Sequence, residues 1–336
     1  MFGSFRTLLA LGVVISHLGS APYMGTYAVF GFYALSGYLM TLIMHETYGY
    51  TRAGLGRYAL NRALRIYPLY LAAAVMSLLL IAFMGENITR AYHDAIGYPK
   101  TVSEIVGNAS LVLFVHTDTR LVPPAWALTV ELCYYALIAL GASRTAPITF
   151  IWLAASTLYT IYLVTGGASF SYRYYTIAAA SLPFALGASL YHFGRARRSR
   201  RFLEWIAGDR TLALLLLLLA GNYGIAGQAT LLAAGGGHFY LNLLLMALTI
   251  ANLAQRRAGT VDKRIGDLSY PIYLTHFQCG LILLALAPGA FDRGDTLFVA
   301  ASLPVVLAVA WGLSVAIEGP IERIRSWVKR RAGARL

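Results

Sequence analysis

The stretch FRTLLALGVVISHL, Phe5 to Leu18, decides how the rest of the chain is interpreted. Arg6 stands near its start and His17 near its end, with ten mostly apolar residues between them. On an α-helix the steps from Arg6 to His17 rise about 16.5 Å, and a bilayer core is about 30 Å thick. With Arg6 at the membrane surface, His17 lies near the midplane. An ionisable side chain there is costly, so His17 is a candidate functional residue; the alternative is a histidine hydrogen-bonded to a neighbouring helix.

The composition is that of an integral membrane protein. Of the 336 residues, 58% are hydrophobic and only 12% are charged, whereas a soluble domain carries about 25% charged residues. The net charge of +13 comes from basic residues between apolar runs, which favours lipid headgroups and anionic cytosolic ligands over nucleic acid. Cys133 and Cys279 both lie inside apolar runs, so neither a disulfide framework nor a CxxC motif is indicated.

Ten apolar runs of membrane-spanning length predict an all-α, multi-pass bundle. They lie near residues 6–26, 28–46, 66–85, 124–141, 148–165, 174–193, 211–226, 234–254, 268–287 and 296–317. With this topology, 22 of the 27 lysines and arginines fall on the side of the N-terminus, as expected of cytosolic segments. The outer loops keep Arg90, Lys100, Arg120, Arg173 and Arg293. We therefore expect one domain, residues 1–336, with both termini in the cytosol and no fused soluble domain.

The longest outer loop, about Gly85 to Pro123, is long for a simple connection. It carries several carboxylates and aromatic residues. We expect it either to shape a substrate entrance or simply to cover the surface.

Glu131 is a carboxylate well inside an apolar run. It follows Pro124 by seven residues, which places it about 10.5 Å below the outer edge of the membrane, if the helix begins there. That depth is close to the one derived for His17. We therefore expect Glu131 to orient or charge the imidazole, as a base and its orienting carboxylate do. The alternative is a carboxylate that braces Trp126, Tyr134 or a break in the backbone.

Arg62 and Arg65, in NRALRIYPLY, share one helical face just before the third apolar run. Two guanidinium groups on one face suit the bidentate binding of phosphate; the alternative is a pair that anchors the helix at the inner surface. Pro68 predicts a short surface helix held at an angle to the following span. Glu318, at the end of the last run, is expected to pair with an arginine.

Hydroxyl, aromatic and small residues are expected around the same cavity. FYALSGYLM (32–40) and GDLSYPIYLTH (266–276) carry most of them, and the small residues also allow close helix packing. The expected cavity-lining residues are Tyr33, Ser36, Tyr38, Trp126, Tyr134, Ser269, Tyr273 and His276. His276 is also explained as a structural histidine. The other histidines lack metal-ligand spacing, so we predict no metal site.

These motifs resemble those of the acyltransferase 3 family of bacterial membrane acyltransferases. The matching segments run in the family's order over nearly the whole chain: Arg6 and His17 as an Arg-x10-His pair, Phe32 to Tyr38, Arg62 to Tyr70, AWALTVELCYY (125–135), LSYPIYLTH (268–276) and the final IEGP (317–320). Tyr33 and Ala34 stand where bulky apolar residues are common, and Ala127 and Thr129 where serine is common. Any one of these segments alone is weak; their order makes the resemblance specific.

The resemblance implies ten core helices in the bacterial inner membrane and transfer of an acetyl or other short acyl group from acyl-coenzyme A to a hydroxyl of a carbohydrate or glycolipid acceptor. It implies essential roles for Arg6 and His17 and contact of the donor with the Arg62 to Tyr70 segment, that is with Arg62, Arg65 and Tyr67. Without a fused hydrolase-like domain, the unit is expected to complete the transfer itself or to hand the acyl group to a separate protein.

The combined hypothesis places the donor's phosphates at Arg6, Arg62 and Arg65, and the thioester within reach of His17. His17 then acts as a general base or carries the acyl group briefly, with Glu131 beside it. The alternative function is a transporter or flippase for a lipid-linked saccharide, which usually shows two related halves. The sequence shows no such halves. It leaves the acceptor, the acyl group and the oligomeric state open.

Overall fold

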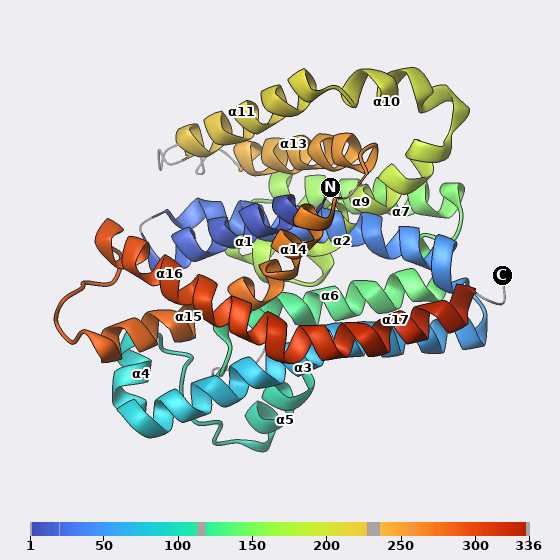
Figure 1. Ribbon diagram of the computed structural model, residues 1–336. Helices are drawn as coiled ribbons and strands as arrows, with labels where there is room; N and C mark the ends of the chain where they lie inside the picture. The colour runs from blue at the N-terminus through green and yellow to red at the C-terminus, as the bar shows by residue number, and fades with distance from the viewer. Residues whose placement is uncertain (1, 20, 113–118, 227–235, 258, 334–336) are drawn as a thin grey trace.

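The computed structural model describes residues 2–19, 21–112, 119–226, 236–257 and 259–333, and within these ranges it is helical and contains no β-strand. The all-α prediction is therefore confirmed. The helices, labelled in Figure 1 where there is room, are α1 (Gly3–Leu18), α2 (Pro22–Ile43), α3 (Arg52–Met84), α4 (Glu86–Tyr92), α5 (Val102–Ser110), α6 (Trp126–Leu137), α7 (Ala146–Thr165), α8 (Phe170–Tyr175), α9 (Ser181–Arg195), α10 (Arg200–Ile206), α11 (Asp209–Ala226), α13 (Gly237–Ala254), α14 (Thr260–Asp267), α15 (Ser269–Leu286), α16 (Thr296–Leu313) and α17 (Gly319–Gly333).

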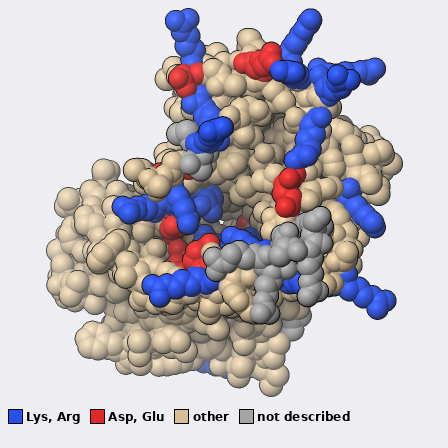
Figure 2. Space-filling model, turned by 45° about the vertical axis from the view of Figure 1, so that its right-hand side comes forward, with Lys and Arg blue, Asp and Glu red and all other residues tan. Residues whose placement is uncertain are grey.

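Among the described residues, seven helical segments are long and apolar enough to cross a membrane: Tyr23–Tyr48, Arg52–Met84, Pro123–Ala142, Ala146–Thr165, Gly237–Ala254, Thr260–Leu286 and Thr296–Lys329. The other three predicted spans correspond to α1, α9 and α11, which have 16, 15 and 18 residues. Large apolar side chains such as Phe83, Leu140 and Ile151 are exposed, as a lipid-facing surface requires. Figure 2 shows a broad lower part of the molecule almost without charged side chains.

Helix α1 lies inside the bundle and packs against α2, α14 and α15 (Figure 1). Its residues Ala10, Val13, Val14 and Leu18 are fully buried. Because other helices surround it, α1 needs no long lipid-facing surface, which explains why it is shorter than a typical span. Its polar residues Arg6 and His17 therefore face the protein interior.

The start of α1 is fixed by Asp262 of α14. This carboxylate accepts hydrogen bonds from the backbone nitrogens of Gly3 (3.0 Å) and Ser4 (2.9 Å) and from the Ser4 hydroxyl (2.9 Å). The first N–H groups of a helix have no partner within the helix, and a carboxylate there also favours the helix dipole. A Cβ at Gly3 would lie 1.7 Å from the carbonyl oxygen of Asp262. The contact therefore requires glycine, and it fixes Arg6 less than one turn further on.

Helix α3 is longer than predicted. It runs from Arg52 through Pro68 to Met84 without a break, so the separate surface helix expected before Pro68 is not present. A proline within a membrane helix is tolerated where other groups compensate for the lost hydrogen bond. Nearby, the Tyr270 hydroxyl donates to the carbonyl of Ile66 (2.9 Å) and ties α15 to this part of α3. Arg62 and Arg65 consequently belong to the same rigid helix as the span.

Helices α2 and α9 touch backbone to backbone through two glycines. A Cβ at Gly187 would lie 1.8 Å from the carbonyl oxygen of Ala34, and a Cβ at Gly37 would lie 2.2 Å from that of Phe184. We expect Gly187→Ala to reduce the free energy of unfolding by about 1–3 kcal/mol, because the added methyl group forces the two helices apart. Thermal unfolding in detergent measures this loss.

Gly194, on the same helix, is the matched control. A Cβ there has no atom within 4 Å among the described residues, so Gly194→Ala is expected to keep or slightly raise the unfolding temperature, since alanine favours a helix more than glycine does. Equal unfolding temperatures for the two variants would contradict the close α2–α9 contact.

Candidate functional site

One cavity, here called the arginine cavity, lies between α1, α2, α3, α6 and α15. Its volume is about 130 Å³. It brings together predicted residues from five separate sequence segments. Its polar and aromatic lining consists of Arg6, Phe32, Tyr33, Ser36, Arg62, Arg65, Glu131, Tyr135, Ser269, Tyr270 and Tyr273.

Two of the three guanidinium groups in this cavity are incompletely paired. The Nε atoms of Arg6 and Arg62 are buried and have no hydrogen-bond partner in the described structure. Another nitrogen of Arg62 donates to the side-chain oxygen of Asn61 (2.7 Å). Buried donors without partners are costly, and guanidinium groups bind phosphate and carboxylate oxygens strongly. The arrangement therefore favours an anionic ligand.

Arg65 differs because it has a carboxylate partner. Its guanidinium group donates to Glu318 (2.6 Å) and lies over the Tyr270 ring, 5.4 Å from the centroid. Glu318 ends a π-helical turn, η7 (Ser314–Glu318), between α16 and α17. The predicted pairing of Glu318 with an arginine is thus confirmed. Glu318 holds Arg65 at the edge of the cavity and offsets part of its charge.

Glu131 lies in the arginine cavity and is held by two hydroxyl groups. Ser36 donates to Oε1 and Tyr135 to Oε2, both at 2.9 Å. The expected pairing of Glu131 with His17 is therefore not what the structure shows. Pro123 and Trp126 line the cavity that contains His17, so α6 begins beside His17. Five further residues carry Glu131 about 7.5 Å beyond Trp126, towards Arg62.

The second cavity, here called the histidine cavity, lies at the other end of α1. Its volume is about 560 Å³. It is formed by the end of α1, the segment after α4, the start of α6, helices α8 and α15, and the loop before α16. The lining residues are Ser16, His17, Leu18, Gly19, His93, Arg120, Pro123, Trp126, Tyr175, Phe277, Arg293 and Gly294.

His17 is oriented by a relay of hydrogen bonds. The Nδ1 atom of His276 lies 2.8 Å from the carbonyl oxygen of Tyr273; because a carbonyl only accepts, this nitrogen carries the proton. With both rings neutral, His276 Nε2 is then an acceptor, and His17 Nδ1 donates to it at 2.9 Å. The lone pair of His17 is consequently on Nε2. A Cβ at Gly25 would lie 3.8 Å from Nε2, so glycine leaves space beside this nitrogen.

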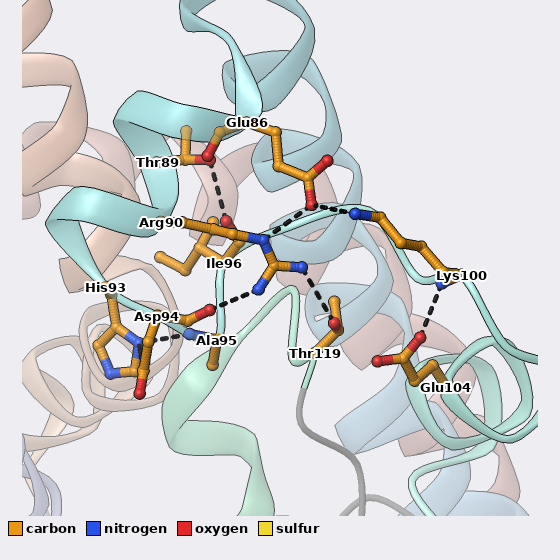
Figure 3. A network of polar contacts seen from close by, with 10 residues as sticks. All are labelled: Glu86, Thr89, Arg90, His93, Asp94, Ala95, Ile96, Lys100, Glu104 and Thr119. Atoms are coloured by element: carbon orange, nitrogen blue, oxygen red, sulfur yellow. Dashed lines mark hydrogen bonds and ion pairs between the residues drawn. The ribbon is translucent and has the colours of Figure 1, made fainter.

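The long loop between α3 and α6 is ordered by a polar network, shown in Figure 3. Arg90 donates to Glu86 (2.8 Å), to the carbonyl of Asp94 (2.7 Å) and to Thr119 (3.3 Å). Glu104 accepts from the backbone nitrogen of Lys100 (2.7 Å), and this bond with others lowers its pKa to about 2. The network lies beside His93 and Arg120, so the loop shapes the histidine cavity. Residues 113–118 of this loop lie outside the described residues.

Three polar residues of the histidine cavity were not predicted. His93, Arg120 and Arg293 come from loops rather than from apolar runs. Burial lowers the pKa of His93 to about 4, so its imidazole is neutral at pH 7. The only signal in the sequence is that Arg120 and Arg293 are two of the few basic residues assigned to outer loops.

The predicted cavity residues separate into three groups. Tyr33, Ser36, Ser269 and Tyr273 line the arginine cavity, and Trp126 lines the histidine cavity. His276 is fully buried behind His17. Two other predicted cavity residues, Tyr38 and Tyr134, line neither cavity, and Tyr67, which was predicted to contact the donor, lines neither as well.

The helical rotation of 100° per residue explains why these three tyrosines do not line the cavities. Tyr38 follows Ser36 by two residues and Tyr67 follows Arg65 by two, so each points to the other side of its helix. The Tyr67 hydroxyl donates to the carbonyl of Ser110 (2.6 Å). Tyr134, the neighbour of Tyr135, donates to the carbonyl of Ile177 (2.6 Å).

A thin partition separates the two cavities, which share no lining residue in the described part of the chain. Tyr273 lines the arginine cavity, and its hydroxyl donates to the carbonyl of Pro124 (2.7 Å), next to Pro123 of the histidine cavity. The thioester of a donor bound at the arginine pair was expected to reach His17, whereas the two cavities do not join in the described part of the chain. No cluster of histidine, cysteine, aspartate and glutamate suited to a metal ion is found among the described residues.

The helices and cavities define a multi-pass membrane protein with one polar site rich in arginine and a second that contains an oriented imidazole. The chain belongs to the acyltransferase 3 family: the model of this family, described as an acyltransferase domain, matches residues 4–315, nearly the whole chain. The resemblance found in the sequence is thus confirmed. Neither a curated protein nor a solved structure matches the chain.

Proposed function

We propose that the chain transfers an acetyl or other short acyl group from acyl-coenzyme A to a hydroxyl of a carbohydrate or glycolipid. The observation that carries the proposal is the geometry of α1. Among the described residues, this one helix presents Arg6, whose Nε has no hydrogen-bond partner, to the arginine cavity, and His17, whose Nε2 has none either, to the histidine cavity. The family supplies acyl transfer as the reaction class.

The proposed orientation places the arginine cavity towards the cytosol of a bacterial inner membrane, in a ten-span topology with both termini cytosolic. The distribution of basic residues along the chain supports it. Figure 2 supports it too, because charged side chains, mostly basic, gather on the face of the molecule where the chain ends. A cytosolic donor then meets the arginine cavity first.

In the proposed complex, Arg6 and Arg62 bind the phosphates of coenzyme A, and Arg65, held by Glu318, adds positive charge at the edge. The pantetheine arm points towards Tyr273. The thioester reaches His17 only when the Tyr273–Pro124 hydrogen bond opens, so donor binding and opening of the partition are coupled. Glu131 is then a carboxylate of the donor site rather than the orienting group of the base.

Two routes of acyl transfer are possible at His17, and both conserve atoms and protons. In direct transfer, Nε2 takes the proton of the acceptor hydroxyl, the oxygen attacks the thioester carbonyl, the C–S bond breaks and the proton passes to the coenzyme A thiolate. In covalent transfer, Nε2 attacks the carbonyl first, the C–S bond breaks and coenzyme A leaves as the thiolate. The acceptor hydroxyl then displaces the neutral histidine from the acyl-imidazolium, and its proton passes to the thiolate. Both routes need the free lone pair on Nε2 that the relay provides.

The proposal is tested by incubating the purified protein with acetyl-coenzyme A carrying a labelled acetyl group, with and without a carbohydrate acceptor. Release of free thiol and transfer of label to the carbohydrate support it. A protein that neither binds nor turns over the donor, yet moves a lipid-linked saccharide across vesicles, would instead be a transporter.

Arg62 is expected to contribute to donor affinity rather than to chemistry. We expect Arg62→Gln to raise the KM for acetyl-coenzyme A about 10-fold or more with kcat largely kept, because one charge-assisted hydrogen bond to phosphate is lost. Initial-rate kinetics measure the change. Arg52→Gln, at the exposed start of the same helix, is the control and keeps the wild-type KM. The same KM for both variants would contradict the assignment of the donor site.

A further inference from the structure

We propose that the acceptor carries an anionic group, a carboxylate or a phosphate, near the hydroxyl that is acylated, and that Arg120 and Arg293 bind this group in the histidine cavity. The inference rests on the proposed function, because it names the substrate class of the same site. Neither the family nor the proposed reaction requires the acceptor to be charged.

The lining of the histidine cavity is one-sided in charge. The two guanidinium groups of Arg120 and Arg293 carry its charge, beside the neutral imidazoles of His17 and His93, and its described lining contains no aspartate or glutamate. Neither arginine forms an ion pair with a described carboxylate. Clefts lined by charge of one sign concentrate ligands of the opposite sign. A neutral sugar would leave this charge uncompensated.

Arg120 is built into the cavity. Its backbone nitrogen donates to the carbonyl of Ala95 (2.8 Å), and the preceding residue, Thr119, accepts from Arg90 in the network of Figure 3. The Nε atom of Arg120 is buried and has no hydrogen-bond partner in the described structure. A fixed backbone with an unsatisfied guanidinium N–H is the arrangement that an oxyanion completes.

Arg293 approaches the same cavity from the loop before α16. Its guanidinium group lies 4.6 Å from the centroid of the Tyr92 ring and 5.9 Å from that of Phe277, and it donates to the carbonyl of Tyr92. Aromatic faces and a carbonyl hold the side chain in place without removing its charge. Arg293 is therefore positioned but still able to bind an anion.

The rest of the cavity suits a sugar ring near the base. Its volume of about 560 Å³ falls in the range of about 300–1,000 Å³ usual for small-molecule sites. Trp126 and Tyr175 lie side by side with ring centroids 4.8 Å apart and offer apolar faces. His17 and Phe277 stack with centroids 5.1 Å apart, so the base and the arginines border one space.

The test uses matched acceptors and the full-length protein in detergent. Methyl glucoside, methyl glucuronide and methyl glucoside 6-phosphate differ only at one position of the sugar. Ligand-detected NMR titration measures their binding without donor, and thiol release from acetyl-coenzyme A measures turnover. We expect the two anionic sugars to bind at least about 10-fold more tightly than the neutral one and to show a higher kcat/KM, as a charge-assisted hydrogen bond provides.

Arg120→Gln and Arg293→Gln are each expected to remove most of this preference while binding of methyl glucoside stays the same. Arg52→Gln removes an exposed cation that does not line the cavity, and it keeps the preference. Preference for the uronate alone or the phosphate alone identifies which anion the subsite takes.

Equal binding of charged and neutral sugars by the wild-type protein would overturn the inference, even if the arginine variants failed to fold. Turnover of acetyl-coenzyme A without charge preference would leave the proposed function standing and this inference wrong. If the anionic sugars bound more tightly but acetyl-coenzyme A were not turned over, the anion subsite would be supported and the proposed acyl transfer would be wrong.

Discussion

Replacement of His17 by alanine is expected to lower the kcat/KM of acyl transfer by about 10²–10⁴, the usual contribution of a general base. The loss follows from removal of the free lone pair on Nε2. The relay from Tyr273 through His276 keeps the proton of His17 on Nδ1 and therefore the lone pair on Nε2. Binding of acetyl-coenzyme A is expected to remain, since the arginine cavity lies at the other end of α1. Thiol release and equilibrium binding of labelled donor separate the two effects.

His238 provides a matched control for this experiment. Its ring is hydrogen-bonded to Asn222 (3.1 Å), and it lines neither cavity. His238→Ala is expected to retain wild-type turnover. Wild-type turnover by the His17→Ala protein would remove the imidazole from the mechanism, and loss of donor binding together with turnover would point to misfolding instead.

The second large effect is expected at His276, which acts through His17 as a positioning residue. In His276→Phe the Nδ1–H of His17 loses its acceptor, so the ring can turn or change tautomer and the lone pair no longer stays on Nε2. We expect kcat to fall about 100-fold with little change in the KM for either substrate, by analogy with the loss caused when the group that orients a catalytic histidine is altered. Initial-rate kinetics with both substrates varied measure this split.

Rescue by a conservative variant distinguishes positioning from packing. The side-chain oxygen of glutamine in His276→Gln can accept from His17 Nδ1, so this variant is expected to recover a large part of the lost kcat. Phenylalanine fills the site at least as well as glutamine does. If the phenylalanine variant were the more active of the two, the hydrogen-bonded relay would have no role in catalysis.

The separation of Arg6 and His17 along the first helix could be predicted from the sequence because helical rise is constant. Arg6 and His17 do occupy different levels of the molecule, each at a cavity. The predicted pairing of His17 with Glu131 was wrong because it too was derived from helical rise, but from a wrong starting point. The calculation assumed that α6 starts at the membrane surface, whereas it starts beside His17, and no feature near Pro124 reveals that position.

Two features were harder to predict: the side of a helix that each side chain faces, and the contacts between loops that are distant in sequence. The short motifs contain both cavity-lining and outward residues, so Ser36 and Tyr38 cannot be separated before the neighbouring helices are known. Arg120 and Arg293 meet only because the loop network fixes one and aromatic rings hold the other. Such contacts depend on tertiary packing, and local periodicity carries no information about them.

The partition formed around Tyr273 has a consequence for the cell as well as for the reaction. An open tunnel from one cavity to the other would carry a file of water across the bilayer, and protons would follow it down the electrical gradient. Moving one charge through 100 mV releases about 2.3 kcal/mol, so a leak of this kind would drain the energy stored across the membrane. With the partition closed, as the structure has it, the two cavities do not join into such a tunnel within the described part of the chain.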